Sequence, residues 1–384
     1  MNLADAALLL ALFGTVTAVW WAVPALTRAH LAFGVAVPSG RAGDPALAAI
    51  RRTYGRNVIV LGVGLAALAY AAGRFTDPVA AAGVGATALV AADLAAYALA
   101  GRAVRAAKAE GDWYAGTRQA VTADLSFSTD PVRVPWRGLA PAVGVLVATA
   151  AAGLLRAGSL PETLPGMAGA TLDGGPRVPT GFWTAANPVL GQVAVTAATV
   201  LVLAAIVRTR PEIDAARPAA SARRYRAYLR ALVRLGLVTA ACANLALAVI
   251  ALRLWELLPP TVLTTAALAA PLLAAAVFAV RFELRVGTGG HRLPELPGEA
   301  EEDTGLVQRD EDRHWHLGGL VYANRDDPAV LVHQRVGGSQ WTVNLGHPVG
   351  RIAGLLLAAL VVALLVAVVL DAAGVLDLPE TQRI

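Results

Sequence analysis

The sequence predicts an all-α integral membrane helical bundle of about eight transmembrane helices, with a small cytoplasmic β-hairpin module. Of its 384 residues, 57% are hydrophobic and only 15% are charged. Soluble proteins carry about 25% charged residues and rarely repeat uncharged apolar runs of about 20 residues, as this chain does. The net charge of +5 comes from arginines that flank these runs, so it indicates membrane topology and gives no reason to expect nucleic-acid binding.

The spans follow from reading the chain from charge to charge. Most are long enough to cross a hydrocarbon core of about 30 Å as helices, at about 1.5 Å per residue. Their many Ala and Gly residues let helices pack closely. In lipid this packing drives helix association, because the hydrophobic effect does not act between helices there. The eight predicted spans cover residues 6–26, 57–73, 78–100, 138–155, 188–207, 235–252, 257–280 and 352–370.

The positive charges predict the orientation of these spans. The segments 25–57, 101–137, 208–234 and 281–351 hold 27 of the 32 Lys and Arg residues. Because cytoplasmic loops are enriched in Lys and Arg, we expect a cell-membrane protein with both termini outside the cytoplasm. No positive residue precedes Arg28, so the first apolar run lacks the start of a cleavable signal peptide and is predicted to be an uncleaved span.

Composition shifts then divide the chain into five regions. The outside loop 157–187 is rich in Pro and Gly, which argues against regular structure there. Residues 208–230 are predicted to form a basic helix on anionic lipid. The regions are a three-span part with its cytoplasmic loop (1–135), a four-span part with that outside loop (136–283), an acidic linker (284–312), a β module (313–350), and a last helix with an outside tail (351–384).

The β module is predicted from two strand-like runs, "AVLVHQR" at 329–335 and "WTVNL" at 341–345. The glycines between them favour a tight turn, so we expect a β-hairpin. Such a hairpin is too small to bury a core of its own. We therefore expect it to pack its apolar face on the bundle or on the lipid surface, as a docking module.

Four histidines of this module, His314, His316, His333 and His347, are the candidate metal ligands. His314 and His316 would share one face of a strand, and the four together would suit zinc or copper. The segment has no CxxC pair, no HExxH helix and no acidic triad. Histidines as amphipathic residues near the membrane surface are the better explanation, so we predict no metal and no other cofactor.

Asp93 is a carboxylate well inside the third predicted span, with Tyr97 one helical turn later on the same face. A carboxylate there costs at least about 2.5–3.5 kcal/mol on insertion scales, so a functional role is the default hypothesis. Two explanations stay open. Either Asp93 carries a proton or cation, or it is a protonated side chain hydrogen-bonded to Tyr97 or to Asn244 of the sixth span.

Enzyme signatures are missing from the sequence. It holds no GxxxxGK[ST] phosphate loop, no GxSxG elbow and no HExxH helix, and its acidic pairs lie in the predicted linker. Cys242 is the only cysteine and lies within an apolar run, so it forms neither an intramolecular disulfide nor a CxxC pair. We predict no catalytic residues.

Three stretches resemble a known family. They are "HLAFGVAVPSGRAGDPALAAIRRTYGR" after the first span, "GPRVPTGFWTAANP" in the outside loop, and "WHLGGLVYANRDDPAVLVHQRVGGSQWTVNLGHP" in the β module. They resemble bacterial multi-pass membrane proteins related to the immunity protein against a sporulation-delaying toxin, with a small C-terminal domain of unknown function. Gly181 stands where the family pattern has a histidine. The third stretch matches at Trp315, Gly318, Tyr322, Asn324, Asp327, Pro328, Val332, Arg335, Trp341, Asn344 and Pro348.

Three functions are therefore expected, in order. The resemblance implies a non-enzymatic immunity or sensing protein that binds a membrane-active peptide either within the bundle or from the outside loop, where Arg177, Phe182 and Trp183 would be the contacts. The alternatives are a proton- or cation-coupled transporter of a small solute that uses Asp93, and an assembly scaffold whose basic face binds the lipid bilayer. The docking residues of the module would be Trp315, Tyr322, Asn324, Arg335, Trp341 and Asn344, and the oligomeric state stays open.

Overall fold

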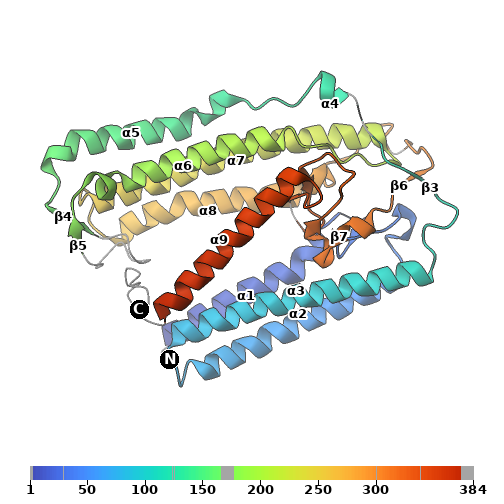
Figure 1. The fold of residues 1–384 in the computed structure, drawn as a ribbon, viewed down its shortest axis with the longest axis horizontal. Coiled ribbons are helices and arrows are strands. Elements are labelled where there is room, and N and C mark those ends of the chain that lie inside the picture. The colour runs from blue at the N-terminus through green and yellow to red at the C-terminus, as the bar shows by residue number, and fades with distance from the viewer. Residues whose placement is uncertain are drawn as a thin grey trace. The chain divides into compact units, whose positions relative to one another are not determined.

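The computed structural model describes residues 3–28, 30–122, 124, 126–165, 177–299, 301–337 and 339–372. It divides into two compact units, which we treat separately: residues 1–124, 210–225 and 286–356 form the first, and 125–209, 226–285 and 357–384 the second. Long helices dominate both units, with a few short strands (Figure 1). In the described ranges, seven helices are long and apolar enough to cross a membrane, which indicates a multi-pass membrane protein.

Three of these helices build the first unit: α1 (Leu3–Leu26), α2 (Pro45–Ala72) and α3 (Pro78–Glu110). Phe13 of α1 and Leu89 of α3 are buried between them. Small residues bring the helices close: a side chain at Gly62 would collide with Thr17 of α1, and one at Gly85 would collide with Phe13. This close approach is the packing that the Ala- and Gly-rich spans predict.

Both α2 and α3 extend beyond the predicted spans. Helix α2 begins at Pro45, twelve residues before the expected start at 57, and α3 continues to Glu110, ten residues past the expected end at 100. Asp44 caps α2, because its carboxylate accepts a hydrogen bond of 2.9 Å from the amide of Ala46. Ala and Arg are strong helix formers, so charge marks where a membrane segment ends but not where its helix ends.

The β module contains the predicted hairpin. Strands β9 (Leu331–His333) and β10 (Trp341–Val343) pair antiparallel, with His333 opposite Trp341. A second short pair, β7 (Trp315–His316) and β8 (Val321–Tyr322), precedes it. Strand β6 (Leu306–Gln308) pairs in parallel with β3 (Arg118–Ala120) from the loop after α3. The prediction of a linker at 284–312 is therefore wrong, since this segment is folded into the first unit.

Acidic residues of that segment form ion pairs with three of the arginines at 208–230. Arg223 pairs with Glu299, Arg224 with both Glu295 and Glu299, and Arg217 with Glu295. Residues 218–230 are the first turns of α7 (Pro218–Leu254), which continues as a membrane-length helix. The predicted basic helix is thus present from residue 218 as the start of α7, and three of the arginines that were expected to bind lipid lie in ion pairs within the protein.

The second unit is built from α5 (Ala140–Arg156), α6 (Phe182–Ile206), the larger part of α7, and α8 (Val262–Arg285), preceded by the short α4 (Ser126–Thr129). Trp255 lies against Gly153 and donates a hydrogen bond to the carbonyl oxygen of Ala185. The predicted irregular loop at 157–187 contains an antiparallel pair, β4 (Thr163–Pro165) with β5 (Arg177–Pro179), although residues 166–176 lie outside the described ranges.

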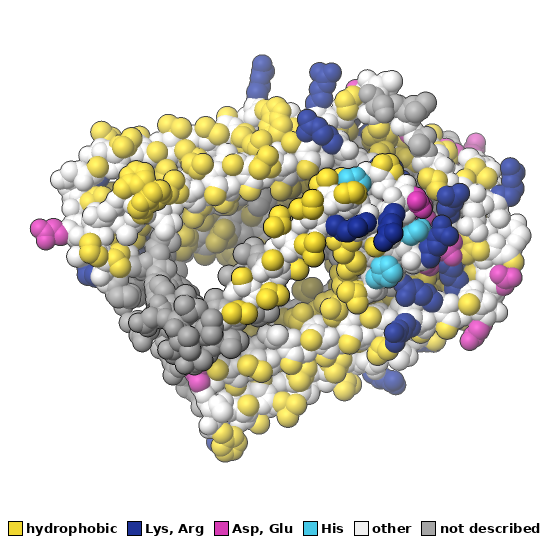
Figure 2. All heavy atoms as spheres, viewed as in Figure 1, with side chains coloured by type: hydrophobic (Ala, Val, Ile, Leu, Met, Phe, Trp, Pro, Cys, Tyr) yellow, Lys and Arg dark blue, Asp and Glu magenta, His cyan; other side chains and the backbone are white. Residues whose placement is uncertain are grey.

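Helix α9 (Pro348–Ala372) covers the predicted eighth span. It begins directly after the β module, in the first unit. The described side chains near its start, including Ile352, Leu355 and Leu356, are exposed and apolar. Hydrophobic side chains cover the long helices, and charged and histidine side chains gather around the short strands of the first unit (Figure 2).

Candidate functional site

Asp93 lies at the centre of the three-helix part of the first unit. It stands one turn from Leu89 on one side and one turn from Tyr97 on the other, and all three residues have 0% exposure. Neither of its carboxylate oxygens has a hydrogen-bond partner among the described residues. The predicted hydrogen bond from Asp93 to Tyr97 is therefore not formed, and the alternative partner Asn244 belongs to the second unit. An unpaired carboxylate is unfavourable in apolar surroundings, so the group needs a proton or a bound cation.

An aromatic cluster surrounds Tyr97, between Asp93 and the β module. The ring centroid of Tyr97 lies 5.3 Å from that of Phe33, 6.0 Å from that of Tyr54 and 6.2 Å from that of Trp20. The Tyr54 hydroxyl donates a hydrogen bond of 2.8 Å to the carbonyl oxygen of Trp20. Gly318 of the module lies directly against the Tyr97 ring, since a Cβ at Gly318 would be 3.1 Å from Tyr97 Cδ1. The module therefore rests one helical turn from Asp93.

Asp312 holds the module in this position. One carboxylate oxygen accepts hydrogen bonds from Arg335 and from the amide of Ala36, and the other lies 2.6 Å from Lys108 Nζ of α3. Burial raises the pKa of Asp312, but Arg335, Lys108 and the Ala36 amide outweigh this, and the pKa lies below its ordinary value. These contacts connect the module to strand β2 (Val35–Ala36) and to α3.

Arg335 completes the contact from the module side. Its guanidinium donates a hydrogen bond of 3.3 Å to the carbonyl oxygen of Gly34 and stacks over the Trp315 ring at 4.9 Å. Gly34 lies in the turn between β1 (Leu31–Ala32) and β2 (Val35–Ala36). Of the predicted docking residues, Arg335 and Trp315 thus lie where the module contacts the rest of the first unit.

The other predicted docking residues hold the module together internally. Asn344 is fully buried and its side-chain oxygen accepts hydrogen bonds of 2.9 Å from the amides of Asn324 and Gly346. Its amide nitrogen donates to the carbonyl oxygens of Asn324, Asp327 and Ala329. The Tyr322 hydroxyl donates to Asp327 at 2.9 Å. Trp341 stacks on His333, at 4.5 Å between ring centroids.

The four candidate histidines serve separate contacts. His333 is buried, and its Nε2 lies 2.9 Å from the Tyr225 hydroxyl. His314 ends a 3-10 turn and His316 lies in β7, so the prediction that they share one strand is wrong. His347 Nδ1 accepts a hydrogen bond from the amide of Val349. Among the described residues, no three His, Cys, Asp or Glu side chains converge as a metal site would require.

A groove of about 690 Å³ runs along α1 and α2 at the level of the apolar spans. Its lining is almost entirely apolar, and Gly14 and Ala18 of α1 lie in it one turn apart. A Cβ at Gly14 would meet nothing within 4 Å, so the space over this glycine is open. The exposed side chains of Leu10, Trp21, Ile59, Val63 and Tyr70 also line the groove. Sequence reasoning missed this site, although the spacing Gly14-x-x-x-Ala18 was visible.

Asn244 belongs to a polar network inside the second unit. Its amide nitrogen donates to the carbonyl oxygen of Ala142 at 2.9 Å and to Thr196 Oγ1 at 3.0 Å. The Gln192 side-chain nitrogen donates to Thr149 Oγ1 and to the carbonyl oxygen of Asn244. These bonds connect α5, α6 and α7, which is how polar side chains stabilise helix contacts in membranes. Asn244 therefore has a structural role in this unit.

The predicted outside contacts differ in how available they are. Arg177 pairs with Glu256 at 2.6 Å and also donates to Thr163, so its guanidinium is used. Phe182 and Trp183 begin α6 and are 71% and 74% exposed, with their ring centroids 5.2 Å apart. Gly181, at the position of the family histidine, is the N-cap of α6.

Comparisons of the chain with protein-family models, with curated proteins and with solved structures return no match.

Proposed function

We propose that the chain is a cell-membrane protein that crosses the bilayer eight times, with α9 as the eighth span and both termini outside the cytoplasm. The seven membrane-length helices and the length of α9 support the count. The charge distribution supports the orientation, because 27 of 32 positive residues fall in alternate loops. In this orientation, the β module and the ion pairs around Asp312 lie in the cytoplasm.

The function that we propose is of the immunity or sensing type and needs no catalysis: the protein binds an apolar membrane-active peptide in the plane of the membrane. The groove between α1 and α2 is the observation that carries this proposal. Its volume of about 690 Å³ falls in the range of ligand sites, which is about 300–1,000 Å³. The lining offers few polar groups, so a water-soluble ligand would gain little there.

The small residues of the groove favour a helical occupant. Gly14 and Ala18 lie four residues apart on α1, and this spacing lets a second helix approach the backbone closely. Leu10 and Val63 supply larger apolar contacts beside them. Helix association in lipid depends on such packing, because lipid tails are as apolar as the helix surface. A peptide sequestered in this groove is kept from forming a pore.

The test is protection of cells against an apolar, pore-forming helical peptide of about 20 residues. Gly14→Leu places a side chain in the groove, since nothing lies within 4 Å of the Cβ position of Gly14. Gly64→Leu is the matched control, because its Cβ position is equally open but it does not line the groove. We expect the wild type and Gly64→Leu to reduce depolarisation and Gly14→Leu to lose that protection. Equal protection by all three would reject the groove as the peptide site.

Proton- or cation-coupled transport is the second candidate, because Asp93 is buried without a hydrogen-bond partner among the described residues. An isolated acid inside a membrane bundle is typical of ion-coupled proteins. Asp93→Asn distinguishes the two functions. Protection that survives Asp93→Asn, together with no acid-driven ion flux in wild-type vesicles, supports immunity. Flux that the substitution abolishes would establish transport.

A further inference from the structure

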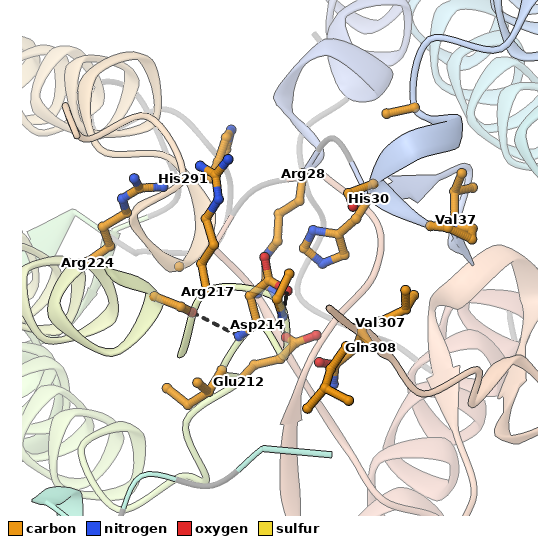
Figure 3. Close-up of a pocket in the computed structure, with 18 of the residues that line it drawn as sticks. Arg28, His30, Val37, Glu212, Asp214, Arg217, Arg224, His291, Val307 and Gln308 are labelled. Atoms are coloured by element: carbon orange, nitrogen blue, oxygen red, sulfur yellow. Dashed lines mark hydrogen bonds and ion pairs between the residues drawn. The ribbon is translucent and has the colours of Figure 1, made fainter. Parts of the chain in front are cut away.

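A polar cleft of about 460 Å³ lies in the first unit, away from the apolar groove. Four segments of the chain border it: 28–42, 212–224, the turn at 288–291, and 303–308, which includes strand β6. Arg28 and His30 lie on one side of the cleft and Arg217 and Arg224 on the other (Figure 3). Nothing in the immunity or transport proposals uses this cleft.

The unmatched polar groups of the cleft are hydrogen-bond donors. Thr288 is 4% exposed, and its hydroxyl has no hydrogen-bond partner among the described residues. Arg224 Nε also has no hydrogen-bond partner among the described residues, although Arg224 Nη2 donates to Glu295 and Glu299. A buried donor without an acceptor costs about 1–3 kcal/mol, so a ligand that supplies acceptors gains affinity here.

A glycine-rich turn shapes one wall of the cleft. Gly287, Gly289 and Gly290 all have positive φ, at 65°, 66° and 81°, which side chains rarely adopt. The turn carries Thr288 into the lining, and a Cβ at Gly289 would lie 3.5 Å from the Arg28 guanidinium. A side chain at residue 289 would therefore come into van der Waals contact with the Arg28 guanidinium, so the glycine leaves the space beside that group open.

The acids of the cleft are already engaged. Glu212 pairs with Arg28 at 2.5 Å. The Asp214 carboxylate accepts a hydrogen bond of 3.0 Å from the amide of Ala216, and that of Asp303 accepts one of 2.9 Å from the amide of Gly305. The three lining arginines and three lining acids balance in charge. Recognition of an anion therefore has to come from directed donors and not from net charge.

We propose that this cleft binds a phosphate group. Phosphate oxygens accept several hydrogen bonds at once, and guanidinium groups match them with paired donors. Thr288, Arg217 and Arg224 would donate directly, and Ser221, whose hydroxyl oxygen accepts a hydrogen bond of 2.9 Å from the Asp214 amide, still has its proton to donate. The phosphate comes either from a lipid headgroup or from a soluble phosphate compound. Arg28 follows the last residue of α1 by two positions, which is where a membrane helix meets headgroups.

The test measures the unfolding temperature of the full chain with two probes. Inorganic phosphate is added to the protein in detergent, and phosphatidic acid is compared with phosphatidylcholine in nanodiscs. A ligand that binds only the folded chain raises the unfolding temperature. Thr288→Val removes the hydroxyl without breaking a hydrogen bond of the protein, and Arg217→Gln removes one lining charge from a pair with Glu295 that is exposed on both sides. Arg313→Gln is the matched control, since it removes the same charge from the first unit outside the cleft.

We expect at least one probe to stabilise the wild type and Arg313→Gln. Thr288→Val and Arg217→Gln should need about tenfold more of that probe for the same rise in unfolding temperature, because each has lost a charge-assisted hydrogen bond to the phosphate. Stabilisation by phosphatidic acid alone identifies a lipid headgroup, and stabilisation by inorganic phosphate identifies a soluble source. The proposal is overturned if neither probe stabilises the wild type. It is equally overturned if Arg313→Gln loses as much as the cleft variants, or if those variants lose nothing.

Discussion

Two buried acids of the first unit show opposite solutions to the same physical problem. Asp312 accepts from Arg335, Lys108 and the amide of Ala36, whereas Asp93 has no hydrogen-bond partner among the described residues. A buried carboxylate with several donors stabilises the folded chain, and one without donors does not. Asp312 therefore has a structural role, and Asp93 remains the candidate for proton or cation binding.

Asp312→Asn should detach the β module from α3. The substitution leaves Arg335 buried without its carboxylate and leaves Lys108 with Asp310 alone, and breaking a buried pair in this way costs about 3–5 kcal/mol. Asp310→Asn is the matched control, because Asp310 also pairs with Lys108 but is 32% exposed against 11% for Asp312. Limited proteolysis within 286–347 measures the effect. We expect fast cleavage in Asp312→Asn only, and equal cleavage in both variants would contradict the account.

Acid should destabilise the first unit, starting below about pH 6.5. Burial and the charge of Arg28 lower the pKa of His333 to about 3, so the folded chain keeps this ring neutral. In the unfolded chain the His333 ring binds a proton near pH 6.5. Proton binding therefore favours the unfolded state, and the folded chain loses stability as the pH falls from 6.5 towards 3. Glu212 adds to the loss at lower pH: burial raises its pKa, but Arg28 and His333 lower it to about 2, from 4.5.

Urea unfolding in detergent between pH 7 and pH 5 measures this dependence. His333→Gln should make it shallower, because the proton linkage of that ring is removed, but part of the slope remains, since burial and Arg28 also lower the pKa of His30 to about 4. His316→Gln replaces an exposed histidine of the same module and should leave the slope unchanged. An unchanged slope in His333→Gln would place the linkage on another group.

At the scale of elements, the contact between two glycine turns explains how the module sits so close to the helices. Gly34 has φ +78°, and a Cβ on it would lie 2.0 Å from the carbonyl oxygen of Gly318. Gly318 in turn has φ +68° and lies against Tyr97. Only residues without a side chain allow this approach, so the position of the module against the helices is fixed by backbone geometry as well as by Asp312.

Gly34→Ala should therefore loosen the module far more than Gly116→Ala. Both positions have positive φ, so both variants pay a backbone cost of about 1 kcal/mol. A Cβ at Gly116 meets nothing within 4 Å, whereas one at Gly34 collides with the module backbone. Hydrogen exchange of residues 315–345 measures the difference. Faster exchange in Gly34→Ala alone is expected, and the same exchange in both variants would show that the contact is dispensable.

The sequence predicted helices and the hairpin better than the pairing of distant segments. Apolar runs and the glycines at 337–338 are local signals, so α1, α5 and the β9–β10 pair could be anticipated. The β3–β6 pairing involves three residues on each side and nearly 190 residues between them. The arginines at 223–224 and the acids at 295–299 were both visible, but their pairing depends on tertiary contacts.

The candidate sites were predicted unevenly for a similar reason. The position of Asp93 in an apolar run was sufficient to select it, because charge in a span is rare. The groove exists because α1 is rotated about its axis so that Gly14 faces open space. A local sequence pattern does not encode this rotation. The polar cleft joins four segments that are distant in the sequence, so Thr288 carried no signal.

At the scale of the whole molecule, the proposed topology is testable with single cysteines. Cys242 is the only cysteine, so Cys242→Ala gives a background without thiols. Thr76→Cys lies in the turn after α2 and Glu110→Cys at the end of α3, and both side chains are exposed. A membrane-impermeant maleimide on intact cells should label position 76 but not position 110. The reverse labelling would invert the orientation and place the β module outside.

The central claim is that the α1–α2 groove binds an apolar helical peptide, and photocrosslinking tests it most directly. A photoreactive residue replaces Val63, which lines the groove, or Val60, which lies on the same helix outside it. The two positions are matched, since their side chains are 67% and 64% exposed. With a labelled pore-forming peptide in the membrane, we predict a crosslink from position 63 that unlabelled peptide displaces, and none from position 60. Equal crosslinking from both positions, or none from position 63, would contradict the proposed function.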